Sequence, residues 1–223
     1  NLKRSVQRQR ELNETQLRML QAQLNPHFLY NTLDCMKWLG VANHVPQIAD
    51  MSTDLAALLR AGISGSELIP LEDELELVRQ YLNIQEIRFE DRFVCEIDVD
   101  ERFQHCIVPK MVLQPLVENA IIHGVADLEE GYIKLWAEAD GGDLLLRVSD
   151  NGRGIAPEVL ARLEQHQDIP GGHLGLTNVD HIIRLYYGVD YGLSASSDGK
   201  TGSCVTLRLP MKKGDGYAEG TDR

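Results

Sequence analysis

His27, which directly follows a proline, has a side chain that can act as a nucleophile. It lies in QLNPHFLYNTLD, residues 23–34, which otherwise has the composition of a helix. Because Pro26 has no N–H and clashes with the carbonyl group four residues earlier, we expect a bend there, with Asn25 as N-cap and Pro26 as the first helical residue. The bend would expose His27 and leave Asn31 on the same face, one turn later. Taken alone, a helical histidine is more often a packing or surface residue, but a neutral imidazole can act as a nucleophile.

Three stretches farther along the chain could form one ligand site. They are LQPLVENAIIHG at 113–124, DNGRGI at 150–155 and GGHLGLTN at 171–178. The second follows an expected strand, and its G-x-G lets backbone approach a flat ligand closely. Asp150 could accept a hydrogen bond from adenine N6 and would repel O6 of guanine, so with Gly152 and Gly154 it favours ATP over GTP. By itself, DNG is more often a plain turn.

The first stretch puts polar side chains on one helical face. Asn119 and His123 are four residues apart, the spacing at which two side chains can meet one ligand. The side-chain oxygen of Asn119 could complete the shell of a Mg²⁺ ion that shares its other ligands with phosphate oxygens. Buried amides are equally common as satisfied core groups. Glu118 could accept a proton or assist Mg²⁺, and packing or capping is its open alternative.

The third stretch leads into a helix and could bind phosphate. The residues concerned are Gly172, His173, Leu174, Gly175 and Leu176, where the free N–H groups of a helix start favour an anion. A tight loop before an amphipathic helix explains the same residues equally well. His173 could contact phosphate itself or simply face solvent.

Composition and charge exclude several classes of protein. The formal net charge is −12, so the chain lacks the positive charge by which a general binder of nucleic acid or anionic lipid neutralises phosphates. Its four cysteines are scattered without a C-x-x-C pair, which indicates reduced thiols rather than a zinc knuckle or a disulfide framework. No stretch is apolar enough to cross a bilayer, and the chain begins in mid-helix, so we expect a soluble, cytoplasmic piece of a longer protein.

The elements that must position the histidine form a helical domain, expected over residues 1–62. An entering helix runs over residues 2–24, followed by a helical hairpin that ends its first helix near Gly40. The hairpin buries a stripe of apolar residues at helical spacing: Leu29, Leu33, Met36 and Leu39, then Ile48, Met51, Leu55 and Leu58. Phe28 is also expected to face the core. Two helices leave an apolar stripe in water, so we predict a dimeric four-helix bundle.

The three ligand stretches belong to a second domain, expected over residues 67–212 after a linker at 61–66. Its expected elements are a helix after Pro70, a strand at 93–99, a helix at 109–123, a hairpin of strands at 132–139 and 144–149, helices at 157–166 and 176–187, and strands at 193–197 and 203–209. This order predicts an α+β domain with helices on one face of a mixed sheet. Residues 213–223 are expected to be a disordered tail.

In this order the three stretches resemble the N, G1 and G2 boxes of the GHKL superfamily, and LQAQLNPHFLYNTLD resembles the phosphoacceptor motif of LytS/YesM-type sensor histidine kinases. LEDELELVRQYLNIQEIRF and GLTNVDHIIRLYYG continue that pattern, over about residues 15–210. The resemblance implies a dimeric four-helix bundle followed by a GHKL-type α/β sandwich. It also implies that His27 receives the γ-phosphoryl group of ATP, that Asn119 binds Mg²⁺, and that Asp150 with Gly152 and Gly154 holds adenine.

The same resemblance implies partners and a location. It implies a homodimer, a response regulator that receives the phosphoryl group on an aspartate, and an upstream membrane-bound sensor that would keep this part on the cytoplasmic side of a bacterial membrane. Two positions depart from the pattern: Ile122 replaces a common lysine, and His173 replaces a glycine. These departures leave open a non-catalytic nucleotide-binding scaffold. A GHKL ATPase is disfavoured because Pro115 stands where those enzymes carry a water-activating glutamate.

Overall fold

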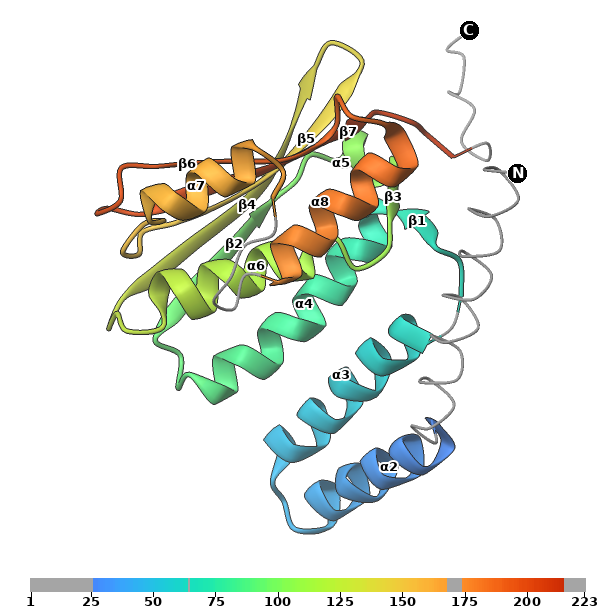
Figure 1. Cartoon of the computed structure of the whole chain (residues 1–223). Coiled ribbons are helices and arrows are strands. Elements are labelled where there is room, and N and C mark those ends of the chain that lie inside the picture. The colour runs from blue at the N-terminus through green and yellow to red at the C-terminus, as the bar shows by residue number, and fades with distance from the viewer. Residues whose placement is uncertain (1–25, 64, 168–173, 215–223) are drawn as a thin grey trace, which may run out of the picture. The chain divides into compact units, whose positions relative to one another are not determined.

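The computed structural model describes residues 26–63, 65–167 and 174–214 and divides the chain into two compact units, residues 1–64 and 65–223. Each unit is described by itself (Figure 1). The predicted entering helix, the proposed N-cap Asn25 and residues 215–223 of the predicted tail lie outside the described residues. Within the described residues, no helix is long and apolar enough to span a membrane.

The first unit contains a helical hairpin of α2 (Pro26–Ala42) and α3 (Pro46–Ile63). The first helix runs two residues beyond its expected end near Gly40. Gly40 does not end the helix; it allows α3 to pack closely against it. A Cβ at Gly40 would lie 2.9 Å from the backbone nitrogen of Ala49 and 3.0 Å from the carbonyl oxygen of Val45, so only glycine lets α3 begin this close to α2. Leu33, Ala49 and Leu58 are buried between the two helices.

Much of the predicted apolar stripe stays exposed in the single hairpin. The exposed predicted residues are Phe28, Met36, Leu39, Ile48 and Leu55, and Trp38, which was not predicted to be in the stripe, is exposed as well. The single hairpin leaves Phe28 64% exposed, so its place in the core of a four-helix bundle stays a prediction. A hairpin of two helices has one inward seam, and residues on its flanks have no neighbour to pack against.

The second unit is built on a five-stranded mixed sheet in the order β2-β4-β5-β7-β6. The strands are β2 (Phe93–Asp98), β4 (Gly131–Asp140), β5 (Asp143–Asp150), β6 (Gly192–Ser197) and β7 (Ser203–Pro210). Only β2 and β4 pair in parallel, and the β4–β5 hairpin turns at Gly141 and Gly142 as predicted. The α+β fold class is therefore confirmed.

Three helices cover one face of this sheet (Figure 1). They are α4 (Leu71–Arg88), the helix that begins with α6 (Gln114–Asn119), and α8 (Leu174–Tyr187), with α7 (Pro157–Glu164) packed beside β6. The core consists of fully buried aliphatic side chains from both layers, among them Val78, Leu116, Leu135, Leu146, Ile183 and Leu207. Burial of side chains of this size stabilises the unit by roughly 1.5–3 kcal/mol each.

Short elements around α4 were missed from the sequence. β1 (Leu68–Pro70) pairs antiparallel with β3 (Ile107–Pro109), and α5 (Glu101–Gln104) forms a single turn. The helix predicted from Pro109 therefore starts only at Gln114, because Pro109 is part of β3. Beyond the last strand, Lys213 forms an isolated β-bridge with Cys106.

The helix that begins with α6 changes its hydrogen-bonding pattern halfway along. After Asn119 it continues as the π-helix η1 (Ala120–Val125), in which the N–H of Ala126 donates to the carbonyl oxygen of Ile121, five residues earlier. π-helical turns are rare and occur frequently at functional sites. The change of pattern follows directly after Asn119, which the sequence indicates as a candidate ligand residue.

Candidate functional site

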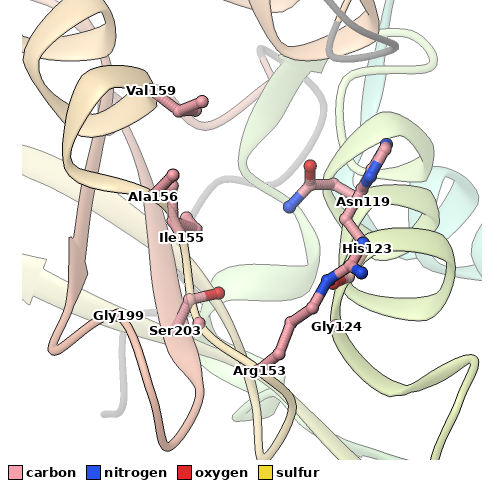
Figure 2. Close-up of a pocket in the computed structure, with 10 residues that line it drawn as sticks. Asn119, His123, Gly124, Arg153, Ile155, Ala156, Val159, Gly199 and Ser203 are labelled. Atoms are coloured by element: carbon pink, nitrogen blue, oxygen red, sulfur yellow. The ribbon is translucent and has the colours of Figure 1, made fainter.

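A pocket of about 320 Å³ opens between the helix of α6 and η1 and the loop after β5 (Figure 2). Its lining comes from three separate parts of the chain: Asn119, His123 and Gly124, then Arg153, Gly154, Ile155, Ala156 and Val159 in the loop after β5 and the start of α7, and Gly199 with Ser203 near the β6–β7 turn. In Figure 2, Asn119, His123 and Arg153 face an opposite wall that carries Ile155, Ala156 and Val159. One wall is polar and the other apolar, as a flat heterocycle with a charged substituent requires.

A second pocket, of about 240 Å³, adjoins the first through shared residues. It is lined by Pro115, Glu118, Asn119, Ile122, His123, Gly175 and Leu176. Asn119 and His123 line both pockets, so the expected common face of these two side chains exists even though the helix becomes π-helical between them. The combined site extends from the loop after β5 to the first turn of α8.

Asp150 holds the loop after β5 from the end of that strand. Its Oδ1 accepts a hydrogen bond from the N–H of Gly152 at 2.8 Å, and its Oδ2 accepts one from the hydroxyl of Ser203 at 2.5 Å. The carboxylate is therefore fixed on both oxygens, and Ser203 connects it to the pocket wall. A carboxylate oxygen has two lone pairs, so each can still accept a hydrogen bond from a ligand amine.

The glycines of this loop are required by backbone contact. A Cβ on Gly152 would lie 2.3 Å from the carbonyl carbon and oxygen of Gly124, and one on Gly124 would lie 2.7 Å from Oδ1 of Asp150. Gly154 has φ +78, a conformation that costs other residues energy. The loop after β5 and the end of η1 are thus in direct backbone contact at the base of the pocket.

Two polar pocket residues, Arg153 and Ser203, were missed in the sequence. Arg153 donates from Nε to the carbonyl oxygen of His123 at 2.8 Å and lies 3.9 Å from Asp127, so it joins the loop to the end of η1. Its position between the two glycines of DNGRG was the available signal. Ser203 had none, because it comes from a strand that meets the loop only in the fold.

The remaining predicted residues of this unit divide into three groups. Asn119 is buried with 7% exposure, and Glu118 is exposed at the mouth of the second pocket. Leu174 is 66% exposed at the start of α8, whereas Gly175 and Leu176, which follow it, line the second pocket. Gly172 and His173 lie outside the described residues.

The first unit presents the candidate nucleophile at its surface. His27 is exposed on α2, and the side-chain nitrogen of Asn31 lies 3.3 Å from Nδ1 and 3.4 Å from Nε2 of the imidazole. Tyr30, on the next turn, lies under the guanidinium group of Arg60 at 5.5 Å from the ring centroid. The histidine therefore has a polar neighbour, and the ring of Tyr30, three residues later, carries a cation from α3.

Comparison with known proteins gives two matching family models. Residues 15–93 match "Histidine kinase", and residues 107–213 match "Histidine kinase-, DNA gyrase B-, and HSP90-like ATPase". Among solved structures, the catalytic domain of histidine kinase ThkA shares the fold with a TM-score of 0.52 at 19% identity, over 65% of this chain and 94% of that one. Full-length ShkA in complex with AMPPNP gives a TM-score of 0.52 at 20% identity, over 90% of this chain and 46% of that one.

Curated relatives match nearly the whole chain. Sensor histidine kinase YesM of Bacillus subtilis (strain 168) is 36% identical over 95% of this chain and 36% of its own length. Sensor protein LytS of the same organism is 30% identical over 95% and 37%, and sensor histidine kinase YpdA of Escherichia coli (strain K12) is 34% identical over 83% and 33%. The chain thus spans about a third of the length of these relatives. It belongs to the LytS/YesM-type sensor histidine kinases.

Proposed function

We propose that this chain is the kinase region of a two-component sensor, which binds Mg²⁺-ATP in the paired pockets and phosphorylates His27. The observation that carries the proposal is the convergence of Glu118, Asn119, His123, Gly154 and Gly175, from three separate stretches, on one continuous site. An ATPase-type domain of this family supports the use of ATP. The pocket volumes suit a nucleotide whose base and phosphates occupy different ends.

The nucleotide would lie with its base in the larger pocket. Asp150 is hydrogen-bonded to Ser203, which lines that pocket, and has lone pairs left for an amino group such as N6 of adenine. Ile155 and Val159 supply the apolar wall against which an aromatic base can pack. Guanine would present an acceptor to the carboxylate, so we expect discrimination in favour of ATP.

The phosphates would extend into the smaller pocket, toward the first turn of α8. Gly175 lies at that turn, lines the pocket and packs closely on Pro115, since a Cβ there would lie 3.2 Å from Cβ of Pro115. The preceding residues Gly172, His173 and Leu174 are proposed as further phosphate contacts, because the free N–H groups at a helix start favour an anion. His123 would offset phosphate charge, because Ile122 supplies no positive charge where the family commonly has a lysine.

Magnesium fits the donor set of the shared wall. Asn119 contributes a side-chain oxygen, and Glu118 lies in the same pocket and could assist the ion or accept a proton. Mg²⁺ is usually held by one or two protein oxygens together with phosphate oxygens and water, so this set suits an ion that arrives with ATP. When bound, the ion would offset the charge of the phosphates.

In the transfer step, the lone pair of a ring nitrogen of His27 attacks the γ-phosphorus. The bond from that phosphorus to the β–γ bridging oxygen breaks, and ADP leaves with the electron pair. Positioning and charge compensation carry most of the catalysis in such a transfer. The phosphoryl group would then pass to an aspartate of a response regulator, and Asn31 would act in the return to the unphosphorylated state.

A homodimer would cover the apolar flank of the hairpin. Phe28, Trp38 and Leu39 are each more than half exposed, so the single hairpin leaves large apolar side chains in contact with water. A second hairpin would bury them in a four-helix bundle. Attachment to a membrane, through a segment upstream of this chain, follows only from the resemblance to membrane-bound sensors.

The proposal is tested by incubating the chain with γ-labelled ATP and Mg²⁺. Acid-labile label on the protein that is lost in His27→Gln supports the kinase. Free labelled phosphate with no labelled protein would indicate an ATPase, which Pro115 disfavours because its side chain in the second pocket cannot activate water. Bound ATP with neither product would indicate a signalling scaffold.

A further inference from the structure

One buried carboxylate has no part in the chemistry described above. Glu74 lies in the first turn of α4 and is only 1% exposed. A buried charge is expensive unless it is hydrogen-bonded, so its partners indicate what it does. The partners are backbone groups 37 and 39 residues away in the sequence.

Glu74 binds the turn that leads into the helix of Asn119. Its Oε2 accepts a hydrogen bond from the N–H of Met111 at 2.7 Å, and its Oε1 accepts one from the N–H of Leu113 at 2.8 Å. Leu113 is the N-cap residue of α6 and has no side-chain oxygen, so α6 receives no cap from its own sequence. The carboxylate from α4 instead accepts a hydrogen bond from the backbone N–H of the N-cap residue itself.

The turn held by Glu74 is strained. Met111 has φ +61, a left-handed conformation that a long side chain adopts only where surrounding contacts impose it. Burial raises the pKa of Glu74, whereas the hydrogen bonds from Leu113 and Met111 and the charge of Lys110 act in the opposite direction. The two N–H groups therefore both constrain the turn and compensate the buried carboxylate.

The anchored helix carries the shared wall of both pockets. It is fixed at its end by the backbone contact of Gly124 with Gly152, and at its start by Glu74. Asn119 lies between these two anchors, at the last α-helical residue before η1. A shift at either end would move the Asn119 amide, and displacements of about 1 Å at such groups have large effects on binding and catalysis.

We propose that Glu74 is a positioning residue for the nucleotide site, because its carboxylate sets the rotation and height of the helix that presents Asn119 to the ligand. The inference rests on the proposed binding of ATP. It adds that α4, which contributes nothing to the lining of either pocket, controls nucleotide affinity through two backbone hydrogen bonds.

The test compares Glu74→Gln with Glu76→Gln in the full chain, by equilibrium binding of Mg²⁺-ATP well below the melting temperature. The glutamine keeps the size of Glu74 but turns an NH₂ group toward one of the two N–H donors. We expect the Kd for ATP to rise about tenfold in Glu74→Gln. It should not change in Glu76→Gln, whose carboxylate is exposed and lies 3.8 Å from the guanidinium group of Arg79.

A double-mutant cycle separates positioning from general stability. If Glu74 acts through Asn119, Glu74→Gln should raise the Kd less than about twofold when Asn119 is already alanine. An equal effect in both backgrounds, or a lower melting temperature with unchanged Kd in Glu74→Gln, would overturn the inference. Should Glu74→Gln not fold, Glu74→Asp, whose shorter side chain reaches one N–H at most, takes its place with the same criteria. A wild-type chain that does not bind ATP would instead refute the proposed function.

Discussion

Replacing Gly152 by alanine should disrupt the pocket through a single methyl group. The added Cβ would lie 2.3 Å from the carbonyl carbon and oxygen of Gly124 and 2.5 Å from its Cα. Carbon atoms in contact are normally about 3.5–4.0 Å apart, so the loop and the end of η1 must separate by about 1 Å. All these neighbours are backbone atoms, which cannot turn away as a flexible side chain can.

The size of the effect follows from that overlap. Overpacking of this kind costs about 1–3 kcal/mol. A loss of that size in the nucleotide-binding arrangement raises the Kd for ATP by roughly 5- to 150-fold. The same loss should lower the melting temperature of a unit of this size by about 2–12 °C.

Gly142→Ala is the matched control for this experiment. It introduces the same methyl group at a glycine with no positive φ and no atom within 4 Å of the new Cβ. It should leave the Kd unchanged and either keep the stability or raise it by up to about 1 kcal/mol. Isothermal titration calorimetry with Mg²⁺-ATP and thermal unfolding measure both quantities. Unchanged affinity in Gly152→Ala would refute the assignment of this backbone contact to the nucleotide site.

Three further predictions concern other parts of the chain. Asn31→Ala should change the rate at which a phosphorylated response regulator loses its phosphoryl group, because the amide lies 3.3 Å from the His27 ring; an unaltered regulator lifetime would remove that role. Trp38→Asp should weaken dimerisation about 30-fold or more in sedimentation analysis, since the indole is 68% exposed in the single hairpin, whereas the exposed Asp50→Asn should not. Burial and the nearby Glu86 raise the pKa of Cys95 to about 12, so its thiol should resist alkylation at pH 9 while the exposed Cys35 reacts. The native state then keeps a proton that the unfolded chain loses above the ordinary thiol pKa of 9.0, so Cys95 makes stability fall as pH rises above 9, and Cys95→Ala should remove that slope.

Much of the second unit could be predicted because its elements carry strong local signals. Alternating residues on both sides of Gly141 and Gly142 predicted the β4–β5 hairpin, and acidic residues after Pro70 predicted the start of α4. β1 and β3 could not be predicted, because three residues are too few to show a period. For the same reason Pro109 was taken as a helix start, although it pairs with Leu68.

Site residues could be predicted only where they lie in short stretches with a recognisable spacing. Asn119 and His123 were found by their helical spacing, whereas Ser203 lies on a strand with no local signal and meets Asp150 only after folding. Glu74 could not be singled out among the acidic residues of its helix, because its partners at Met111 and Leu113 are distant in the sequence. Sequence patterns record local spacing, and buried polar pairs formed across the fold leave little trace in them.

The phosphoryl group itself offers the most direct measurement of the central claim. After incubation with Mg²⁺-ATP, the chain should be digested under neutral conditions, which preserve a phosphorus–nitrogen bond, and its peptides analysed by tandem mass spectrometry. The account predicts one phosphoryl group on the imidazole of His27, absent when Asp150 or Asn119 is replaced by alanine. Phosphorylation at another residue, or an unmodified His27 in a chain that binds ATP, would contradict it.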